Sequence, residues 1–299
     1  MRILLTGGSG LLGKYLLERQ PRGFEICSVN RAGEHHSGSA HVRRLDLTDF
    51  RGLQRLLTDF QPEGIIHTAA EGSVDKVEAD PQRYYKVNTL LPEFLANFAS
   101  YTHSRFVHIS SNAVFGGESQ VYSDCDELNP VNAYGRLKAE AEARVMTADP
   151  SAVIMRPILM FGLPNPGGRR NIAQNFIEEL SHGRSVKALT DIVSQPLYGA
   201  DAAEIVWDAF QSKLNGPVNV SGGETLSIYE FALLIADVFN LDPALIEPCR
   251  LADMDGLSKR PMRTVFTLTR LHEELSYKSR PVREGLERLR SEFQQSVEE

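Results

Sequence analysis

The sequence predicts an α/β protein built on a Rossmann-type, doubly wound parallel sheet with a smaller C-terminal lobe. Two observations carry this prediction. Short β-rich runs alternate with longer segments whose apolar residues recur at helical spacing, and a glycine-rich turn joins the first strand to the first helix. Such alternation produces right-handed βαβ crossovers and a parallel sheet covered by helices on both faces. A chain of 299 residues is long enough for this sheet and an attached lobe.

The elements of the sheet follow one another through the first half of the chain. Runs rich in β-branched and other apolar residues predict strands at Arg2–Thr6, Phe24–Val29, Val42–Leu45, Gly64–His67 and Arg105–Ile109. Apolar residues three and four positions apart predict helices at Leu11–Arg19, Phe50–Asp59, Pro81–Ser100 and Ala133–Met146. Strands and helices therefore alternate through most of this region.

Composition and charge exclude several classes of function. A net charge of -7 argues against a nucleic-acid partner, which is bound mainly by neutralising phosphates. Cys27, Cys125 and Cys249 are far apart and lack C-x-x-C spacing, so we expect neither a disulfide framework nor a metal site, as is typical of a reducing cytoplasm. The chain shows neither a signal peptide pattern nor about 18 consecutive apolar residues, so no membrane span is expected.

The glycine-rich turn TGGSGLLG occupies residues 6 to 13. Residues 8 to 13 match G-x-G-x-x-G, and Gly7, Gly10 and Gly13 match the related spacing G-x-x-G-x-x-G. Either pattern is weak alone, and a tight turn without a ligand is the alternative. Here the turn follows a predicted strand and opens a predicted helix, the context in which the pyrophosphate of a dinucleotide lies on the helix N-terminus.

A second constellation combines a serine, a tyrosine and a lysine. Ser111 follows the strand Arg105–Ile109, at the carboxyl edge where α/β sheets bind ligands, and Tyr134 and Lys138 share one face of a helix. A phenol has a pKa of about 10, but a nearby ammonium and an oxidised nicotinamide both favour its anion. Tyr134 could then exchange a proton with a substrate oxygen, Lys138 could lower the pKa of Tyr134 and hold the cofactor ribose, and Ser111 could hydrogen-bond the same oxygen. An ordinary surface-helix pair is the alternative.

The regular alternation of strand and helix patterns ends after Arg156. A stretch rich in glycine and proline, residues 161 to 169, precedes a less regular mixture of helices and short strands. We therefore expect a dinucleotide-binding Rossmann domain at residues 1–160 and mainly a substrate-binding lobe at residues 161–299. The buried run Pro217–Ser221 predicts that the chain re-enters the main sheet, within the region from about residue 190 to 225.

Taken in chain order, these motifs resemble the extended short-chain dehydrogenase/reductase superfamily. The matching segments are TGGSGLLG, His67-Thr-Ala-Ala70, Ser111 and Tyr134-x-x-x-Lys138, and the resemblance covers nearly the whole chain. Within the superfamily, residues 74–81, 86–88 and 109–115 are similar to segments of dTDP-4-dehydrorhamnose reductases.

The resemblance implies a nicotinamide cofactor and assigns its contacts. The glycine loop would hold the phosphates, the segment after the third strand would border the adenine, and the segment after the fourth would pass the ribose and nicotinamide. The expected cofactor contacts are Gly7, Ser9, Gly10, Leu11, Leu12, Gly13, Asn30, Arg31, Asp46, Leu47, Ala69, Ala70, Tyr134 and Lys138. Ser111, Tyr134 and Lys138 would form the catalytic triad.

The chain departs from the dTDP-4-dehydrorhamnose reductases in the segments expected to contact the hexose. Asn112 stands where those reductases usually carry an aspartate, and the tryptophan that usually follows their sixth strand is missing from residues 156–162. A standard dTDP-rhamnose product is therefore not implied. Arg169 and Arg170 lie beside a predicted helix start and suit a substrate diphosphate, with a solvated basic loop as the alternative. Ser111, Asn112, Arg169 and Arg170 are the expected substrate contacts.

The end of the second strand predicts which nicotinamide cofactor is preferred. NAD-selective folds of this kind normally place an acidic residue there, which binds the ribose hydroxyls and repels a 2′-phosphate. This chain has Asn30 and Arg31 instead, and a guanidinium can pair with a phosphate. NADPH is therefore expected to be preferred over NADH, unless Arg31 is only a solvated loop cation.

Three functions remain open from the sequence. The first is a nicotinamide-dependent reductase of a nucleotide-linked 4-keto-6-deoxy sugar, with Tyr134 as proton donor. The second is a nucleotide-sugar epimerase of the same superfamily; a dehydratase is disfavoured because the residues after Ser111 supply no acidic pair. The third is a noncatalytic partner resembling the regulatory β subunit of methionine adenosyltransferase. The expected partners are a nucleotide-sugar substrate and a second copy of the chain, as a homodimer in the cytoplasm.

Overall fold

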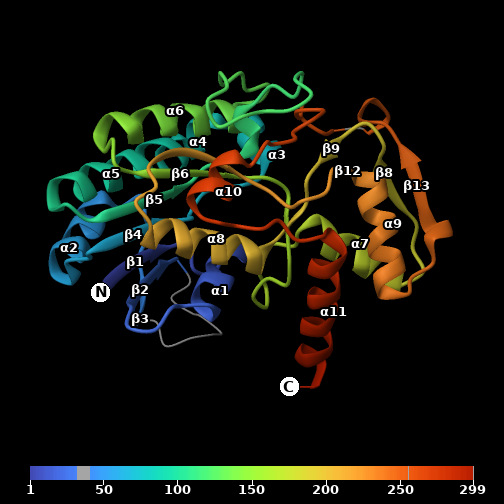
Figure 1. The fold of residues 1–299 in the computed structure, drawn as a ribbon, viewed down its shortest axis with the longest axis horizontal. Coiled ribbons are helices and arrows are strands. Elements are labelled where there is room, and N and C mark those ends of the chain that lie inside the picture. Colours follow the sequence, from blue (N-terminus) through green and yellow to red (C-terminus); the bar gives the residue numbers. More distant parts are fainter. Residues whose placement is uncertain (32–40, 255, 299) are drawn as a thin grey trace.

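The computed structural model describes residues 1–31, 41–254 and 256–298. Its centre is a seven-stranded sheet with the order β11-β6-β5-β4-β1-β2-β3, in which every neighbouring pair of strands is parallel (Figure 1). The strands of this sheet are β1 (Arg2–Thr6), β2 (Glu25–Asn30), β3 (His41–Arg44), β4 (Gly64–His67), β5 (Arg105–Ile109), β6 (Val153–Pro157) and β11 (Gly216–Val220). This order confirms the predicted Rossmann-type sheet.

Helices cover both faces of the sheet. They are needed on both because successive apolar side chains of each strand point to opposite faces. Leu4, Ile65 and Phe106 point to one face and pack against α2 (Phe50–Phe60), α5 (Leu91–Thr102) and the end of α6 (Ala133–Ala148). The intervening strand residues point to the other face, which is covered by α1 (Leu11–Glu18) and α8 (Gly199–Gln211). The sheet is therefore doubly wound, with a core on each side (Figure 1).

Two predicted strands are displaced by one residue. The strand predicted at Phe24–Val29 is Glu25–Asn30, and the one predicted at Val42–Leu45 is His41–Arg44. The parallel register extends to the pair Asn30 and Arg44, so polar residues complete the hydrogen-bonded ladder beyond the apolar run. Asn30 therefore ends the strand rather than following it.

The single helix predicted at Pro81–Ser100 is interrupted. It consists of α4 (Pro81–Tyr85), a π-helical turn η1 (Lys86–Leu90) and α5, and a short helix α3 (Val74–Ala79) precedes it. Pro92 has no N–H to donate to the carbonyl of Asn88, so a regular α-helical ladder cannot be completed there. The Asn88 side chain accepts from the Glu71 N–H at 2.9 Å and donates to the Glu71 carbonyl at 3.0 Å, which fixes the loop after β4 to this helix.

The C-terminal lobe lies at one end of the sheet (Figure 1). Its small sheets are the pairs β10–β7, β12–β9 and β13–β8. Its strands are β7 (Met160–Phe161), β8 (Val186–Leu189), β9 (Val193–Ser194), β10 (Leu197–Tyr198), β12 (Leu226–Ser227) and β13 (Ile246–Cys249). The remaining helices and turns are α7 (Ile172–Ser181), α9 (Ile228–Phe239), α10 (Thr269–Glu274), α11 (Val282–Glu298), η2 (Asn112–Val114), η3 (Pro243–Leu245) and η4 (Leu251–Asp253). Between the lobe segments, the chain returns to the main sheet where β11 pairs with β6.

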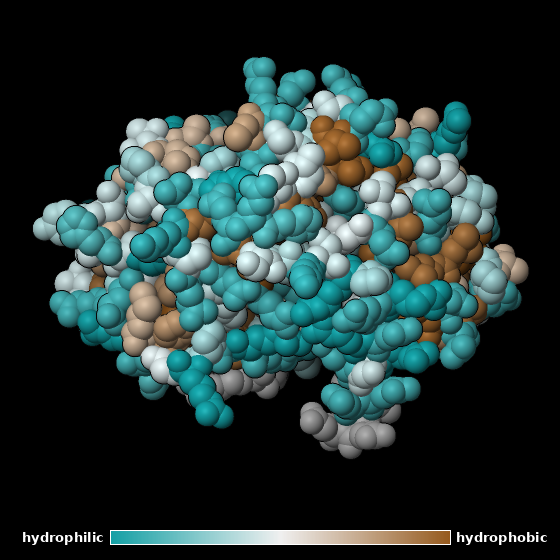
Figure 2. Space-filling model, in the orientation of Figure 1, coloured by the Kyte–Doolittle hydropathy of each residue, from teal (hydrophilic) through white to brown (hydrophobic). Residues whose placement is uncertain are grey.

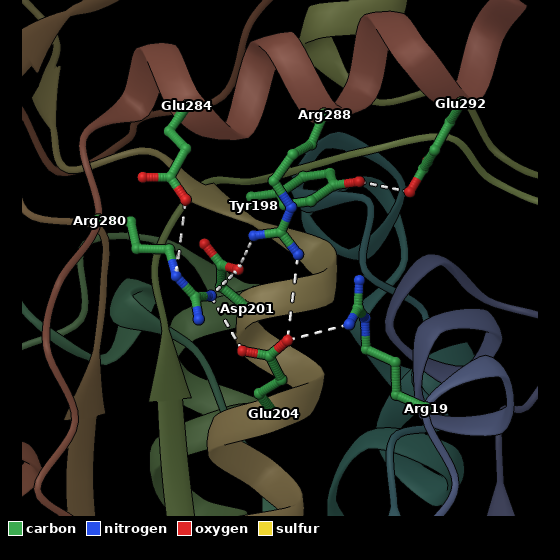
Figure 3. A network of polar contacts seen from close by, with 8 residues as sticks. All are labelled: Arg19, Tyr198, Asp201, Glu204, Arg280, Glu284, Arg288 and Glu292. Atoms are coloured by element: carbon green, nitrogen blue, oxygen red, sulfur yellow. Dashed lines mark hydrogen bonds and ion pairs between the residues drawn. The ribbon is translucent and has the colours of Figure 1, made fainter.

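A network of polar side chains fixes the C-terminal helix α11 to the rest of the molecule (Figure 3). The buried Asp201 on α8 accepts from Arg280, just before α11, and from Arg288 on it. Glu292, in the C-terminal half of α11, accepts from Tyr15 of α1 at 2.6 Å and from Tyr198. Buried charges that are paired in this way fix orientation, so α11 is tied to the helix that opens at the glycine loop.

The surface shown in Figure 2 is mainly hydrophilic, with apolar residues gathered on the side of the C-terminal lobe. Across the three described ranges, no helix combines the length and apolar character needed to span a membrane.

Candidate functional site

The predicted site residues gather at the carboxyl edge of the sheet. In register, Thr6 at the end of β1 lies beside His67 at the end of β4, and His67 lies beside His108 of β5. The chain segments that leave these strands are the glycine loop, residues 68–70 and residues 110–115. Parallel strands thus bring three distant parts of the sequence to one edge.

The glycine loop forms a tight turn between β1 and α1. Gly7 has a φ of +78°, and a Cβ there would lie 2.5 Å from the Thr68 hydroxyl oxygen and 2.7 Å from the Ala69 nitrogen. A Cβ on Gly13 would lie 2.2 Å from the Gly7 carbonyl oxygen. Both positions therefore require glycine because neighbouring backbone occupies the space.

The start of α1 fits a phosphate group. Gly10 is the N-cap residue and supplies no side-chain cap, and the first turn carries no acidic residue. Ser9 and Gly10 are exposed at the carboxyl edge. The first-turn N–H groups and the helix dipole are thus available to an anion, so these residues fit the pyrophosphate of a dinucleotide.

The expected adenosine end lies beside β2 and β3. Asn30 is buried, Arg31 is exposed, and Leu47 is buried below the edge. Hydrogen bonds from the Thr48 N–H and hydroxyl lower the pKa of Asp46, and the charge of Arg31 lowers it further. Arg31 is therefore close enough to Asp46 for their charges to interact.

Ser111 and Tyr134 come together at the other end of the site. The Ser111 hydroxyl lies close enough to Tyr134 to lower the pKa of the phenol. It donates to Asn112 Oδ1 at 3.4 Å and accepts from the Ala113 N–H at 3.2 Å. α6 can approach this closely because of Gly135: a Cβ there would lie 2.1 Å from the Ala113 carbonyl oxygen. Asn132 caps the helix by accepting from the Gly135 N–H at 2.8 Å.

The pKa of Tyr134 differs from the sequence-based expectation. Burial raises it above the ordinary value of a phenol, while the hydrogen bond with Ser111 and the charge of Arg169 lower it and Glu71 raises it. The Lys138 side chain points toward strand β5, where its Nζ donates to the Ile109 carbonyl at 2.7 Å and lies 3.4 Å from His108 Nε2. Desolvation thus outweighs the groups that lower the Tyr134 pKa. That Lys138 lowers this pKa stays a prediction.

Burial also acts on Lys138. Its side chain is 1% exposed, and burial lowers its pKa to about 8, although Glu142 on the same helix favours its charged form. The ammonium is consequently poised to lose its proton near neutral pH, unlike an exposed lysine.

The residues expected to contact the substrate do not all lie at the site. Arg169 Nη1 lies 4.0 Å from Glu71 Oε1, beside the site, whereas Arg170 pairs at 2.6 Å with Glu178 on α7. Asn112 donates to the Thr264 hydroxyl at 3.0 Å, which connects the site to the C-terminal segment. The structure thus brings Arg169 and Asn112 to the site, and a substrate role for Arg170 stays a prediction.

Sequence reasoning missed three residues of this region. Glu71, which reaches Arg169 and acts on the Tyr134 pKa, follows Ala69 and Ala70 and carries no motif of its own. His67 and His108 are fully or almost fully buried at the ends of neighbouring strands. A histidine at or next to the end of each of two apolar runs was the signal that could have identified the pair. In the part of the chain that the structure describes, no group of three or more potential ligand side chains is arranged to hold a metal.

The buried His67 predicts acid sensitivity of the fold. Burial and the charge of Lys138 lower its pKa from 6.5 to about 3. Below pH 6.5 the unfolded chain therefore binds a proton that the folded chain excludes, so stability is complete above that pH and falls as the pH drops toward 3. At about 1.4 kcal/mol for each pH unit, His67 costs roughly 3 kcal/mol of unfolding free energy by pH 4.5.

Urea denaturation of the wild type and of His67→Phe at pH 7.5 and 4.5 measures this contribution. The variant should show the flatter pH dependence, whereas His182→Gln, at an exposed histidine, should behave as the wild type. If the free energy of unfolding decreased equally between pH 7.5 and 4.5 in His67→Phe and in the wild type, the prediction would be contradicted.

Comparison with known proteins agrees with this geometry. Residues 1–295 match the family described as RmlD substrate binding domain. A dTDP-4-dehydrorhamnose reductase of Aggregatibacter actinomycetemcomitans is 26% identical, over 97% of this chain and 98% of its own length. Methionine adenosyltransferase 2 subunit beta of Xenopus tropicalis is 27% identical, over 95% of this chain and 86% of its own length.

A solved structure shows the same architecture. The dTDP-4-dehydrorhamnose reductase from Bacillus anthracis in complex with NADP superposes with a TM-score of 0.86 at 25% identity, and the match covers 97% of this chain and 99% of that one. Because the family match spans nearly all residues and the fold agrees, the chain belongs to the RmlD substrate binding domain family.

Proposed function

We propose that the protein is an NAD(P)H-dependent reductase of a nucleotide-linked 4-keto-6-deoxy sugar. Family membership, the reductase relative and the NADP-bound neighbour support an oxidoreductase with a nicotinamide cofactor. The observation that carries the proposal is that Ser111 lies close enough to Tyr134 to lower its pKa, at the same sheet edge as a glycine turn that fits a pyrophosphate. These are the groups that carbonyl reduction requires beside such a cofactor.

The residues divide the chemistry as follows. A bound reduced nicotinamide supplies a hydride for the carbonyl carbon. Tyr134 gives its phenolic proton to the carbonyl oxygen, a transfer that its raised pKa prepares because it starts as the neutral acid. Ser111 donates a hydrogen bond to the same oxygen and stabilises its developing negative charge. Lys138, protonated below a pH of about 8, holds the cofactor ribose.

Arg169 is our candidate for the substrate diphosphate. Its guanidinium has only a 4.0 Å contact with Glu71 and is 65% exposed, so an anion can displace Glu71. Because Arg169 lowers the Tyr134 pKa and Glu71 raises it, the position of this guanidinium also affects the proton donor. Asn112, which donates to the Thr264 hydroxyl of the C-terminal segment, would lie near the sugar.

A regulatory role is the second candidate. It is favoured by the similarity to the subunit beta of methionine adenosyltransferase 2 from Xenopus tropicalis. The proximity of Ser111 to Tyr134 argues for catalysis, since a purely structural partner has no need of it.

Incubation with NADPH and a panel of nucleotide-linked 4-ketosugars tests the proposal. Loss of the reduced-cofactor absorbance with at least one sugar, and none without sugar, is the expected result. A regulatory subunit or an epimerase would bind the cofactor without this net oxidation.

Arg31 tests the cofactor preference. Arg31→Ala should raise the KM for NADPH roughly 10- to 150-fold, as expected for one charge-assisted phosphate contact, while the KM for NADH changes little. Arg22→Ala, which removes another exposed cation on the turn before β2, is the matched control and should alter neither value. Equal or tighter NADH binding by the wild type would contradict the preference.

A further inference from the structure

Two histidines lie directly beneath the proposed catalytic lysine. His67 and His108 are register partners on β4 and β5, with ring centroids 5.2 Å apart and planes inclined by 20°. They are 1% and 0% exposed, on the sheet face that α5 and α6 cover. The reaction described above uses neither ring.

The hydrogen bonds fix the tautomer of His108. Its Nε2 lies 3.4 Å from Lys138 Nζ. A charged ammonium can only donate, so this nitrogen accepts and the ring proton resides on Nδ1. A protonated ring would place a second positive charge beside the ammonium, and burial together with Lys138 accordingly keeps the pKa of His108 well below its usual value. His108 is thus a neutral acceptor.

Packing alone does not explain this pair. His67 Nδ1 contacts the Thr6 hydroxyl at 2.6 Å, but His67 Nε2 and His108 Nδ1 have no hydrogen-bond partner within the described residues. Buried polar atoms without partners destabilise a fold, and phenylalanine would fill the same stacked space without them. A role toward Lys138 accounts for retaining the imidazoles.

His108 is one of the few groups near Lys138 that can accept a hydrogen bond from its ammonium. The Ile109 carbonyl takes one ammonium N–H at 2.7 Å, and His108 takes a second, which leaves one for a ligand at the carboxyl edge. Glu142 on α6 also favours the charge, but its oxygens are already engaged by Arg156 of β6 and by Ser110. His67 faces the lysine from β4 and opposes it only if protonated.

We propose that His108, held in place by its stack on His67, is a positioning residue that keeps the buried Lys138 ammonium charged and fixed directly beneath the cofactor site. What Lys138 does there rests on the proposed reductase function. The effect of His108 on Lys138 does not, because it is a property of the protein without ligands.

The test is an NMR titration of protein carrying lysine labelled with ¹³C at Cε, whose shift reports protonation of Nζ. The Lys138 signal is assigned by its loss in Lys138→Met. His108→Phe keeps the ring stack and removes the acceptor, and should lower the Lys138 pKa by about one unit. His108→Gln retains an acceptor oxygen and should restore at least half of that shift. His67→Phe keeps the contact between His108 and Lys138 and is the matched control. It should lower the Lys138 pKa by less than half of the decrease seen in His108→Phe.

An unchanged Lys138 pKa in folded His108→Phe would overturn the proposal. If that variant does not fold, His108→Leu replaces it and must show the same decrease. A shifted pKa with no reductase activity would contradict the proposed function alone, and reductase activity with an unshifted pKa would contradict the role of His108 alone. For an active enzyme, the alkaline limit of the kcat profile should move down by the same amount in His108→Phe and recover in His108→Gln.

Discussion

Tyr134→Phe is expected to lower kcat by roughly 10²- to 10⁴-fold while the affinity for the cofactor stays within about threefold. The substitution removes only the phenolic hydroxyl, which carries the proton and lies near Ser111. The ring remains partly buried in its present place. Steady-state kinetics on the substrate found with the ketosugar panel, together with NADPH fluorescence titration, measures both quantities.

Two variants sharpen this prediction. Tyr85→Phe removes the phenol on α4 that donates to Glu140 on α6, and should leave kcat unchanged. Lys138→Met should reduce both kcat and cofactor affinity, because the lysine is expected to hold the ribose. Near wild-type turnover in Tyr134→Phe would show that another group supplies the proton.

Glu142→Ala should lower the free energy of unfolding by about 3 to 5 kcal/mol. Glu142 and Arg156 have side chains that are 5% and 4% exposed, and their closest contact is 2.7 Å. Without the Glu142 carboxylate, Arg156 would remain a buried charge without its closest ion-pair partner, beside the Asp124 carbonyl and the Phe115 ring and within electrostatic reach of the Asp124 carboxylate. Since Glu142 joins α6 to β6, the loss also loosens the helix that carries Tyr134.

Urea denaturation at neutral pH measures this loss. Glu140→Ala, which breaks an exposed ion pair on the same helix, is the matched control and should cost much less. Replacing both partners, as Glu142→Gln with Arg156→Met, should recover part of the stability because no uncompensated charge stays buried. A loss in Glu142→Ala no larger than in Glu140→Ala would refute the importance of this pair.

The sequence predicts the sheet well because local patterns determine it. Apolar runs between turns define β1, β4 and β5 to the residue, and the glycines at positions 7 and 13 record contacts so close that no other residue fits. The strands of the lobe escape prediction for the opposite reason. Several are only two residues long, too short for any periodicity.

The site is less predictable because its electrostatics depend on residues far apart in the sequence. The spacing of Tyr134 and Lys138 places both on one helix face, yet only the fold shows that Lys138 is drawn down to the Ile109 carbonyl. Adjacent arginines look equivalent in the sequence, but Arg169 reaches Glu71 while Arg170 pairs with Glu178. Such differences follow from where each backbone directs its side chain, which short patterns do not encode.

Hydride transfer itself is tested most directly with NADPH that carries deuterium at the reactive ring carbon. The protein is incubated with this cofactor and a nucleotide-linked 4-ketosugar, and the sugar is analysed by mass spectrometry and NMR. The reductase account predicts equimolar consumption of NADPH and sugar, with one deuterium at the former carbonyl carbon, and almost none of this product with Tyr134→Phe. An altered sugar without deuterium, or no NADPH consumption by wild-type protein that binds the cofactor and every ketosugar offered, would contradict it.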